Sequence, residues 1–249
     1  PAKLMTALND QALARLIAHE LENAGVKQHI KTVPDLPDQI FNGLFHEGEQ
    51  IASVWNDDIE KVEFEESFMR DGIKGAACVV IANDLSGTST NSLIKLANEA
   101  EIPVFVGNVT MMGALRLEEL EGKLDLVFIN NEEIDEYIEH NSHVESWKDV
   151  ARELNAPMLV TSGSKQVTLV YPEAEERDFP IRKQEVLGTT LGAGDLFMAT
   201  TIKFIVQNGQ QLENAVDFSL ASASGILRRD DANIGRPEAM DSAAVNPPG

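Results

Sequence analysis

Two glycines and an acid stand together late in the chain, in Gly192-Ala193-Gly194-Asp195, just ahead of an apolar stretch that predicts a helix. Small residues let a backbone approach a ligand closely, and a helix start points N–H groups and a positive dipole end at it. Such amides suit a transferring phosphoryl group, and the Asp195 carboxylate suits proton removal from an attacking hydroxyl. The sequence therefore indicates phosphoryl transfer to an alcohol. The alternative is a glycine-rich helix start in which Asp195 is only a first-turn charge.

Residues 189–195 resemble the second signature of the ribokinase-like (PfkB) carbohydrate kinases, Asp-Thr-x-Gly-Ala-Gly-Asp, with Thr189 in place of the leading acid. The resemblance implies that Asp195 is the catalytic base and that the amides of residues 192–194 form the anion hole. It also places Thr190 among the residues that bind the nucleotide. The expected cofactors are ATP and Mg²⁺.

Two further stretches are similar to motifs of the same family and follow in its order. Asn130 and Glu133 match Asn-x-x-Glu, which implies nucleotide binding by both and a role for Glu133 with Mg²⁺, in part through water. Thr161 and Gly163 match the nucleotide-contacting pattern Thr-x-Gly-x-x-Gly, whose last glycine is Gln166 here. Taken alone, residues 130–133 are more typical of a capped, acidic, solvated helix start. The alternative for residues 161–166 is an ordinary hairpin turn.

The opening of the chain departs from the family pattern. The sequence holds no Gly-Gly pair, which the family uses to close over the sugar, and residues 9–26 resemble the region after that segment. We therefore expect a domain that is truncated at its N-terminus relative to the family. Loss of the first strand would expose a sheet edge and favour association, and a homodimer is one state that the sequence allows.

The elements that must position these residues alternate along most of the chain. Residues 9–25 predict a helix capped by Asn9 or Asp10, and two apolar stretches, 39–45 and 50–55, predict a β-hairpin within a lid of about residues 30–58. Strands are expected at 76–82, 103–106, 124–129, 158–161 and 167–171, and helices at about 90–100 with Thr90 as cap, from 132, and at about 147–154, 193–208 and 212–229. This alternation predicts one α/β domain over 1–249, with a mainly parallel sheet between helices in three layers (ribokinase-like by the resemblance) and a small β lid.

Composition narrows the classes of function. The net charge of −21 disfavours nucleic-acid binding through a basic face, and the chain shows no membrane span or secretory signal. The one cysteine, Cys78, lies in an apolar stretch, which fits a reducing cytoplasm. Asn83 and Asp84 follow the same strand and are weak candidates for contact with the substrate.

The sequence thus predicts a cytoplasmic, ATP-dependent kinase that phosphorylates a primary hydroxyl of a small sugar or nucleoside. The subfamilies considered are ribokinase, fructokinase and pseudouridine kinase, with a weak preference for the last. The alternative function is that of a non-catalytic, nucleotide-binding or structural relative, which the changes at Thr189 and Gln166 and the absent Gly-Gly pair favour.

Overall fold

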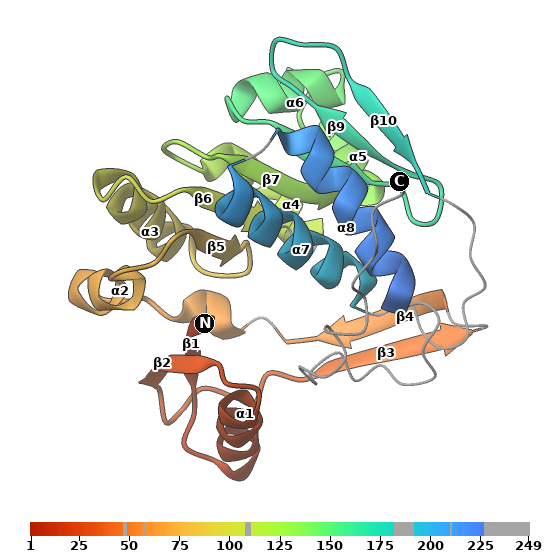
Figure 1. The fold of residues 1–249 in the computed structure, drawn as a ribbon. Coiled ribbons are helices and arrows are strands. Elements are labelled where there is room, and N and C mark those ends of the chain that lie inside the picture. Colours follow the sequence, from red (N-terminus) through yellow and green to blue (C-terminus); the bar gives the residue numbers. More distant parts are fainter. Residues whose placement is uncertain (47–48, 57, 108–110, 182–191, 210, 227–249) are drawn as a thin grey trace. The chain divides into compact units, whose positions relative to one another are not determined.

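A computed structural model describes residues 1–46, 49–56, 58–107, 111–181, 192–209 and 211–226 (Figure 1). Contacts divide the chain into two compact units. Unit 1 comprises residues 1–56 and 184–249, and unit 2 comprises residues 57–183. The single domain over 1–249 and its N-terminal truncation stay predictions.

The described part of unit 2 contains a six-stranded sheet in the order β10-β9-β8-β7-β6-β5 (Figure 1). Its strands are β5 (Val79–Ala82), β6 (Val104–Gly107), β7 (Leu126–Asn130), β8 (Met158–Thr161), β9 (Gln166–Val170) and β10 (Arg177–Pro180). Neighbours from β5 to β8 run parallel, whereas β8, β9 and β10 pair antiparallel. The predicted α/β class with a mainly parallel sheet is confirmed.

Helices connect the parallel strands, as parallel pairing requires. The helices of unit 2 are α2 (Glu66–Ile73), α3 (Gly87–Glu99), α4 (Met111–Leu115), α5 (Asn131–His140) and α6 (Trp147–Glu153), with short turns η1 (Asp58–Lys61) and η2 (Leu117–Glu119). Helix α3 packs on β6, α5 on β7 and β8, and α6 on β9. All of β6 and the first four residues of β7 are buried, and their unbroken apolar sequences are typical of parallel strands in a core.

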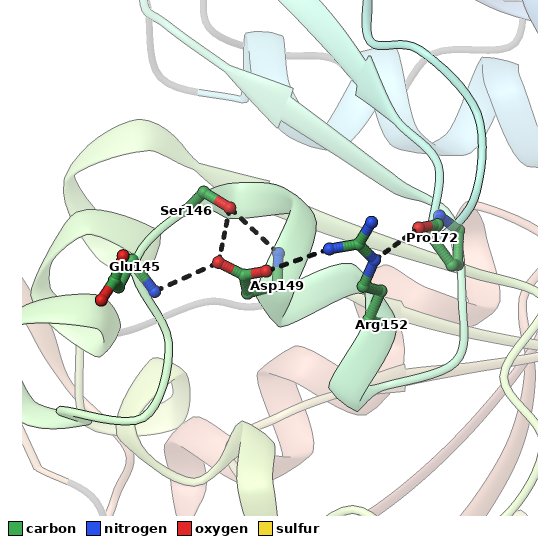
Figure 2. Close-up of polar contacts among 5 residues, drawn as sticks. All are labelled: Glu145, Ser146, Asp149, Arg152 and Pro172. Atoms are coloured by element: carbon green, nitrogen blue, oxygen red, sulfur yellow. Dashed lines mark hydrogen bonds and ion pairs between the residues drawn. The ribbon is translucent and has the colours of Figure 1, made fainter.

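Figure 2 shows how α6 begins and how it is held. The Ser146 hydroxyl accepts from the Asp149 amide at 3.2 Å and donates to the Asp149 carboxylate at 2.7 Å. This hydroxyl, with the Glu145 amide and Arg152 beside it, holds the pKa of Asp149 below its usual value. Arg152 also donates to the Pro172 carbonyl at 3.1 Å, which fastens α6 to the segment after β9.

Unit 1 contains a β-α-β segment, a hairpin and two late helices. Strands β1 (Lys3–Leu8) and β2 (Lys27–Thr32) pair parallel and are joined by α1 (Ala12–Asn23). Strands β3 (Phe41–His46) and β4 (Glu49–Trp55) form an antiparallel hairpin. Helices α7 (Ala193–Asn208) and α8 (Leu212–Ile226) pack together, with the Phe204 and Phe218 rings 5.0 Å apart between centroids.

The predicted hairpin and the alternation of strands and helices from β5 to β9 are confirmed, while two predicted helix caps are wrong. Helix α1 has Gln11 at its N-cap without a side-chain cap. The Asn9 oxygen accepts from the amide of Gln11 itself, ahead of the first turn, and its nitrogen donates to Leu36 and Asp38. Helix α3 is capped by Ser86, and the Thr90 amide already bonds to the Ser86 carbonyl, so Thr90 lies inside the helix. The described residues contain no helix that is long and apolar enough to span a bilayer.

Candidate active site

The ends of β7 and β8 bring two of the predicted motifs together. These strands are parallel neighbours, and Asn130 pairs with Thr161 in their register. Ligands of open α/β sheets gather outside the carboxyl ends of parallel strands. Asn130, Glu133, Thr161 and Gly163 therefore form one group at this edge of the unit 2 sheet.

Asn130 and Glu133 form a reciprocal capping box at the start of α5. The Asn130 side chain accepts from the Glu133 amide at 2.9 Å, and the Glu133 carboxylate accepts from the Asn130 amide at 3.0 Å. Glu133 is 6% exposed. The box fixes the carboxylate and the amide side chain at a helix start, where the dipole favours an anion.

The turn from Thr161 to Gln166 is closed by backbone hydrogen bonds, with Gln166 at the position where the family pattern has a glycine. Gly163 has a φ of +56°, a left-handed conformation that favours glycine, and the Ser162 amide donates to the Gln166 carbonyl at 2.9 Å. The Gln166 side chain donates to Thr168 at 3.1 Å and to Asp178 at 3.0 Å. This side chain therefore extends along β9 and β10, and the backbone of the turn closes without a glycine at this position.

The predicted anion hole and base lie in unit 1, at the start of α7. Gly192 is the N-cap with a φ of +80°, and the Leu196 amide makes the first helical bond to the Gly192 carbonyl at 3.0 Å. The amides of Ala193, Gly194 and Asp195 precede that bond and have no acceptor within the helix. Gly194 and Asp195 are exposed. The group in unit 2 and the group on α7 belong to different units of the chain. Thr190 lies outside the described residues.

A buried polar cluster follows β5, where Asn83 and Asp84 were predicted as weak candidates. Asn83 is 3% exposed and donates to the Gly113 carbonyl at 2.7 Å, so its side chain makes a buried structural hydrogen bond. Arg116 donates to the Asn83 carbonyl at 3.2 Å and to Glu60 at 3.0 Å. Burial, with a smaller effect of Glu60, raises the pKa of Asp84, while Arg116 opposes the rise. No local pattern in the sequence indicates Arg116 or Glu60, because the two residues lie 56 positions apart in the chain.

The histidines of unit 2 take part in ordinary structural contacts. His140 lies 2.9 Å from the Glu136 carbonyl, and His143 lies 2.9 Å from the Glu153 carboxylate. Within the residues that the structure describes, no three His, Cys, Asp or Glu side chains gather into a group that could hold a metal ion.

Comparison with known proteins identifies the family. Residues 1–239 match the family model described as pfkB family carbohydrate kinase. The chain belongs to this family. The three motifs that carried the resemblance thus lie in a member of the pfkB family.

Among curated relatives, this pfkB family chain is similar to the bifunctional protein HldE. It is 26% identical over 263 residues to HldE of Pseudomonas savastanoi pv. phaseolicola (strain 1448A / Race 6), which covers 96% of this chain and 51% of the relative. It is 24% identical over 257 residues to HldE of Klebsiella pneumoniae (strain 342), which covers 96% of this chain and 50% of the relative. The chain spans about half the length of these relatives.

Solved structures similar to this chain include two kinds of kinase. Adenosine kinase from Anopheles gambiae has a TM-score of 0.79 and 18% identity, covering 94% of this chain and 75% of that one. Ribokinase from Giardia lamblia has a TM-score of 0.77 and 17% identity, covering 97% and 83%. Ribokinase from Arabidopsis thaliana, solved with ribose and ATP, has a TM-score of 0.71 and 18% identity, covering 96% and 80%. The ribokinase-like fold is confirmed.

Proposed function

We propose that this chain transfers the γ-phosphoryl group of ATP to a primary hydroxyl of a sugar or a nucleoside, in the cytoplasm. The start of α7 carries the proposal. It combines a left-handed glycine at the N-cap, helix-start amides with no acceptor inside the helix, and an exposed carboxylate at Asp195. Amides stabilise developing charge, and a carboxylate accepts a proton, so both requirements of phosphoryl transfer meet within one turn.

In the proposed reaction, Asp195 accepts the proton of the acceptor hydroxyl as its oxygen bonds to the γ-phosphorus. The bond between this phosphorus and the β,γ-bridging oxygen breaks, and that oxygen leaves with ADP. The amides of Ala193, Gly194 and Asp195 stabilise the negative charge on the transferring group. The products are the phosphorylated acceptor and ADP.

Nucleotide binding is assigned to Asn130, Glu133, Thr161 and Gly163, with Thr190 in the same role. The register of β7 and β8 supports this, because it makes Asn130 and Thr161 neighbours at the edge where ligands of such sheets gather. The backbone at Gly163 leaves space, since a Cβ built there would have no atom within 4 Å.

The residues at this edge fit a magnesium ion through the carboxylate of Glu133. Mg²⁺ is usually held by one or two carboxylates, with water and substrate phosphates completing its coordination. The capping box holds one carboxylate, Glu133, at a helix start beside Asn130. Glu133 would hold the ion, in part through water, and the bound ion would supply neutralisation of phosphate charge.

The hairpin β3–β4 is proposed as the lid that covers the acceptor. It presents large apolar side chains to solvent, with Leu44 60% exposed and Val54 71% exposed. Exposed apolar surface on a small hairpin is typical of an element that covers a ligand. The lid would therefore determine which acceptor the chain binds.

Turnover tests the proposal directly. We would measure ADP release with ATP and Mg²⁺ against ribose, fructose, pseudouridine and adenosine. We expect release that depends on one acceptor class and that falls at least about 100-fold in Asp195→Asn, since general base catalysis contributes about 10²–10⁴-fold. Asp217→Asn, an exposed acid on α8, is the matched control and should retain parental turnover.

The rival function is that of a non-catalytic relative that binds nucleotide. The absent Gly-Gly pair and the changes at Thr189 and Gln166 favour it, yet the turn at Gln166 is closed by a hydrogen bond from the Ser162 amide to the Gln166 carbonyl. Acceptor-dependent turnover that is unchanged in Asp195→Asn would exclude Asp195 as the base. Nucleotide binding by the folded chain without turnover on any acceptor would favour the non-catalytic relative.

A further inference from the structure

The hairpin β3–β4 depends on how its two ends are held. Its strands pair with each other and, among the described strands, with no other sheet. An isolated two-stranded hairpin is marginally stable in water. Asp38 lies three residues before Phe41, where β3 begins, and Asn56 directly follows Trp55, where β4 ends. The contacts of these two residues therefore set the base of the hairpin.

Three side chains fasten this base. The Asn56 side chain donates to the Asp38 carbonyl at 2.9 Å, which links one end of the hairpin to the other. The Asn9 side chain donates to the Asp38 carboxylate at 2.8 Å. We call Asn9, Asp38 and Asn56 the hairpin clamp. Through Asp38 and Asn56, both ends of the hairpin are connected to Asn9, the residue that follows β1.

Asn9 is the anchored member of the clamp. It is 7% exposed, so water competes little for its bonds. Its amide nitrogen donates to the Leu36 carbonyl at 2.9 Å as well as to Asp38, and its amide oxygen accepts from the Gln11 backbone at 3.0 Å. The strand that precedes it pairs with β2 through Leu8 and Thr32. A side chain with this many fixed partners has one orientation, which it transmits to the hairpin.

We infer that Asn9 is a positioning residue that fixes the base of the β3–β4 lid through Asp38 and so sets acceptor affinity. This inference rests on the proposed function for the role of the lid in acceptor binding. The fixing of the hairpin itself does not depend on catalysis. The Asn9 side chain acts through the clamp and takes no part in the chemical step.

A reversal of donor and acceptor tests the inference. Asn9→Asp retains the oxygen that accepts from Gln11 but sets a carboxylate against the Asp38 carboxylate and the Leu36 carbonyl, with no donor among them. Asp38→Asn still offers an oxygen to Asn9 and serves as the matched control. The double variant Asn9→Asp/Asp38→Asn restores a donor–acceptor pair with the roles exchanged, although the Leu36 carbonyl loses its donor.

Trp55 provides a readout that requires no activity. The chain has two tryptophans, and Trp147→Phe leaves Trp55, next to Asn56, as the sole reporter. In that background we expect Asn9→Asp to lower the fluorescence anisotropy of Trp55. We also expect it to raise the acceptor KM about tenfold with kcat changed less than about twofold, since a hydrogen bond to a charged group is worth about one order of magnitude in affinity. Asp38→Asn retains an acceptor for Asn9 but loses its charge, so it should shift both values less than Asn9→Asp does, and the double variant should recover most of both values.

The outcomes separate the clamp from a general effect on folding and from the kinase assignment. Parental anisotropy in Asn9→Asp would overturn the inference. Equal impairment of Asn9→Asp and the double variant would also overturn it, because loss of the donor to the Leu36 carbonyl alone predicts equality. If Asn9→Asp does not fold, Asp38→Ala removes the same link and must lower the anisotropy. If the parent shows no turnover on any acceptor, the proposed function fails while the anisotropy series still decides the clamp.

Discussion

Asn130 and Thr161 are register partners at the carboxyl ends of β7 and β8, although 30 residues separate them in the sequence. Because parallel neighbours end at the same edge of a sheet, two motifs that sequence analysis treats separately become one group of polar side chains. This pairing supports the proposal that a motif at a helix start and a motif in a hairpin turn bind the same nucleotide.

Glu133 has a capping role in the structure and a proposed role with Mg²⁺, and substitution can separate the two. Glutamine also completes a capping box, so Glu133→Gln should leave the free energy of unfolding within about 0.5 kcal/mol of the parent, whereas Glu133→Ala should lower it by about 1 kcal/mol. If the carboxylate also serves Mg²⁺, both variants should need more Mg²⁺ for half-maximal turnover. Denaturant unfolding and a Mg²⁺ titration of turnover measure the two effects. If Glu133→Gln needs no more Mg²⁺ for half-maximal turnover than the parent does, Glu133 serves only in helix capping.

Gly163 tests whether the turn after β8 contacts the nucleotide. Gly163 at φ +56° and Gly75 at φ +72° share the left-handed conformation, and a Cβ at either would have no atom within 4 Å. Replacing either by alanine should therefore cost only backbone strain, about 1–2 kcal/mol of unfolding free energy. Only Gly163→Ala should also raise the KM for ATP. Equal ATP KM values in the two variants would argue against contact between this turn and the nucleotide.

Asp84 should make the protein less stable as pH rises above the ordinary carboxyl range. Burial raises its pKa in the folded state, so between the unfolded and folded pKa values the folded chain binds more protons than the unfolded chain. The free energy of unfolding then falls with rising pH across that window and stays reduced at neutral pH. Asp84→Asn removes this term, so it should be more stable than the parent at pH 7 and similar near pH 3. Urea unfolding at several pH values measures the difference in unfolding free energy between Asp84→Asn and the parent. A difference that does not change with pH would refute a raised pKa of Asp84 as its cause.

Sequence periodicity predicted the strands β5 to β9 and the hairpin β3–β4, but it missed β1, β2 and β10, which are mostly not buried. Every residue of β6 is buried, and its short apolar run is an unambiguous signal. In β1 only Ala7 is buried and in β2 no residue is, so neither strand carries the alternation that marks a half-buried strand. The charged β10 was missed for the same reason, since Phe179 is its one buried residue.

The candidate site was predictable where a motif is local. The capping box joins Asn130 and Glu133, which are three positions apart, so its chemistry can be read from the sequence. The bonds of Asn9 to Leu36 and Asp38 cross 27 and 29 positions, and the contact of Arg116 with Glu60 crosses 56. Contacts of that range depend on the fold, so no local pattern reveals them.

The division of the chain has a consequence for the order of events during synthesis. Unit 2 is one continuous stretch, whereas unit 1 is assembled from residues 1–56 and 184–249. A ribosome that has released residue 183 has supplied every part of the six-stranded sheet but only the first part of unit 1. Because domains fold as units while the chain is made, the sheet can be complete before α7 leaves the ribosome. The nascent chain would therefore acquire the edge proposed to bind nucleotide before it acquires Asp195, the proposed base.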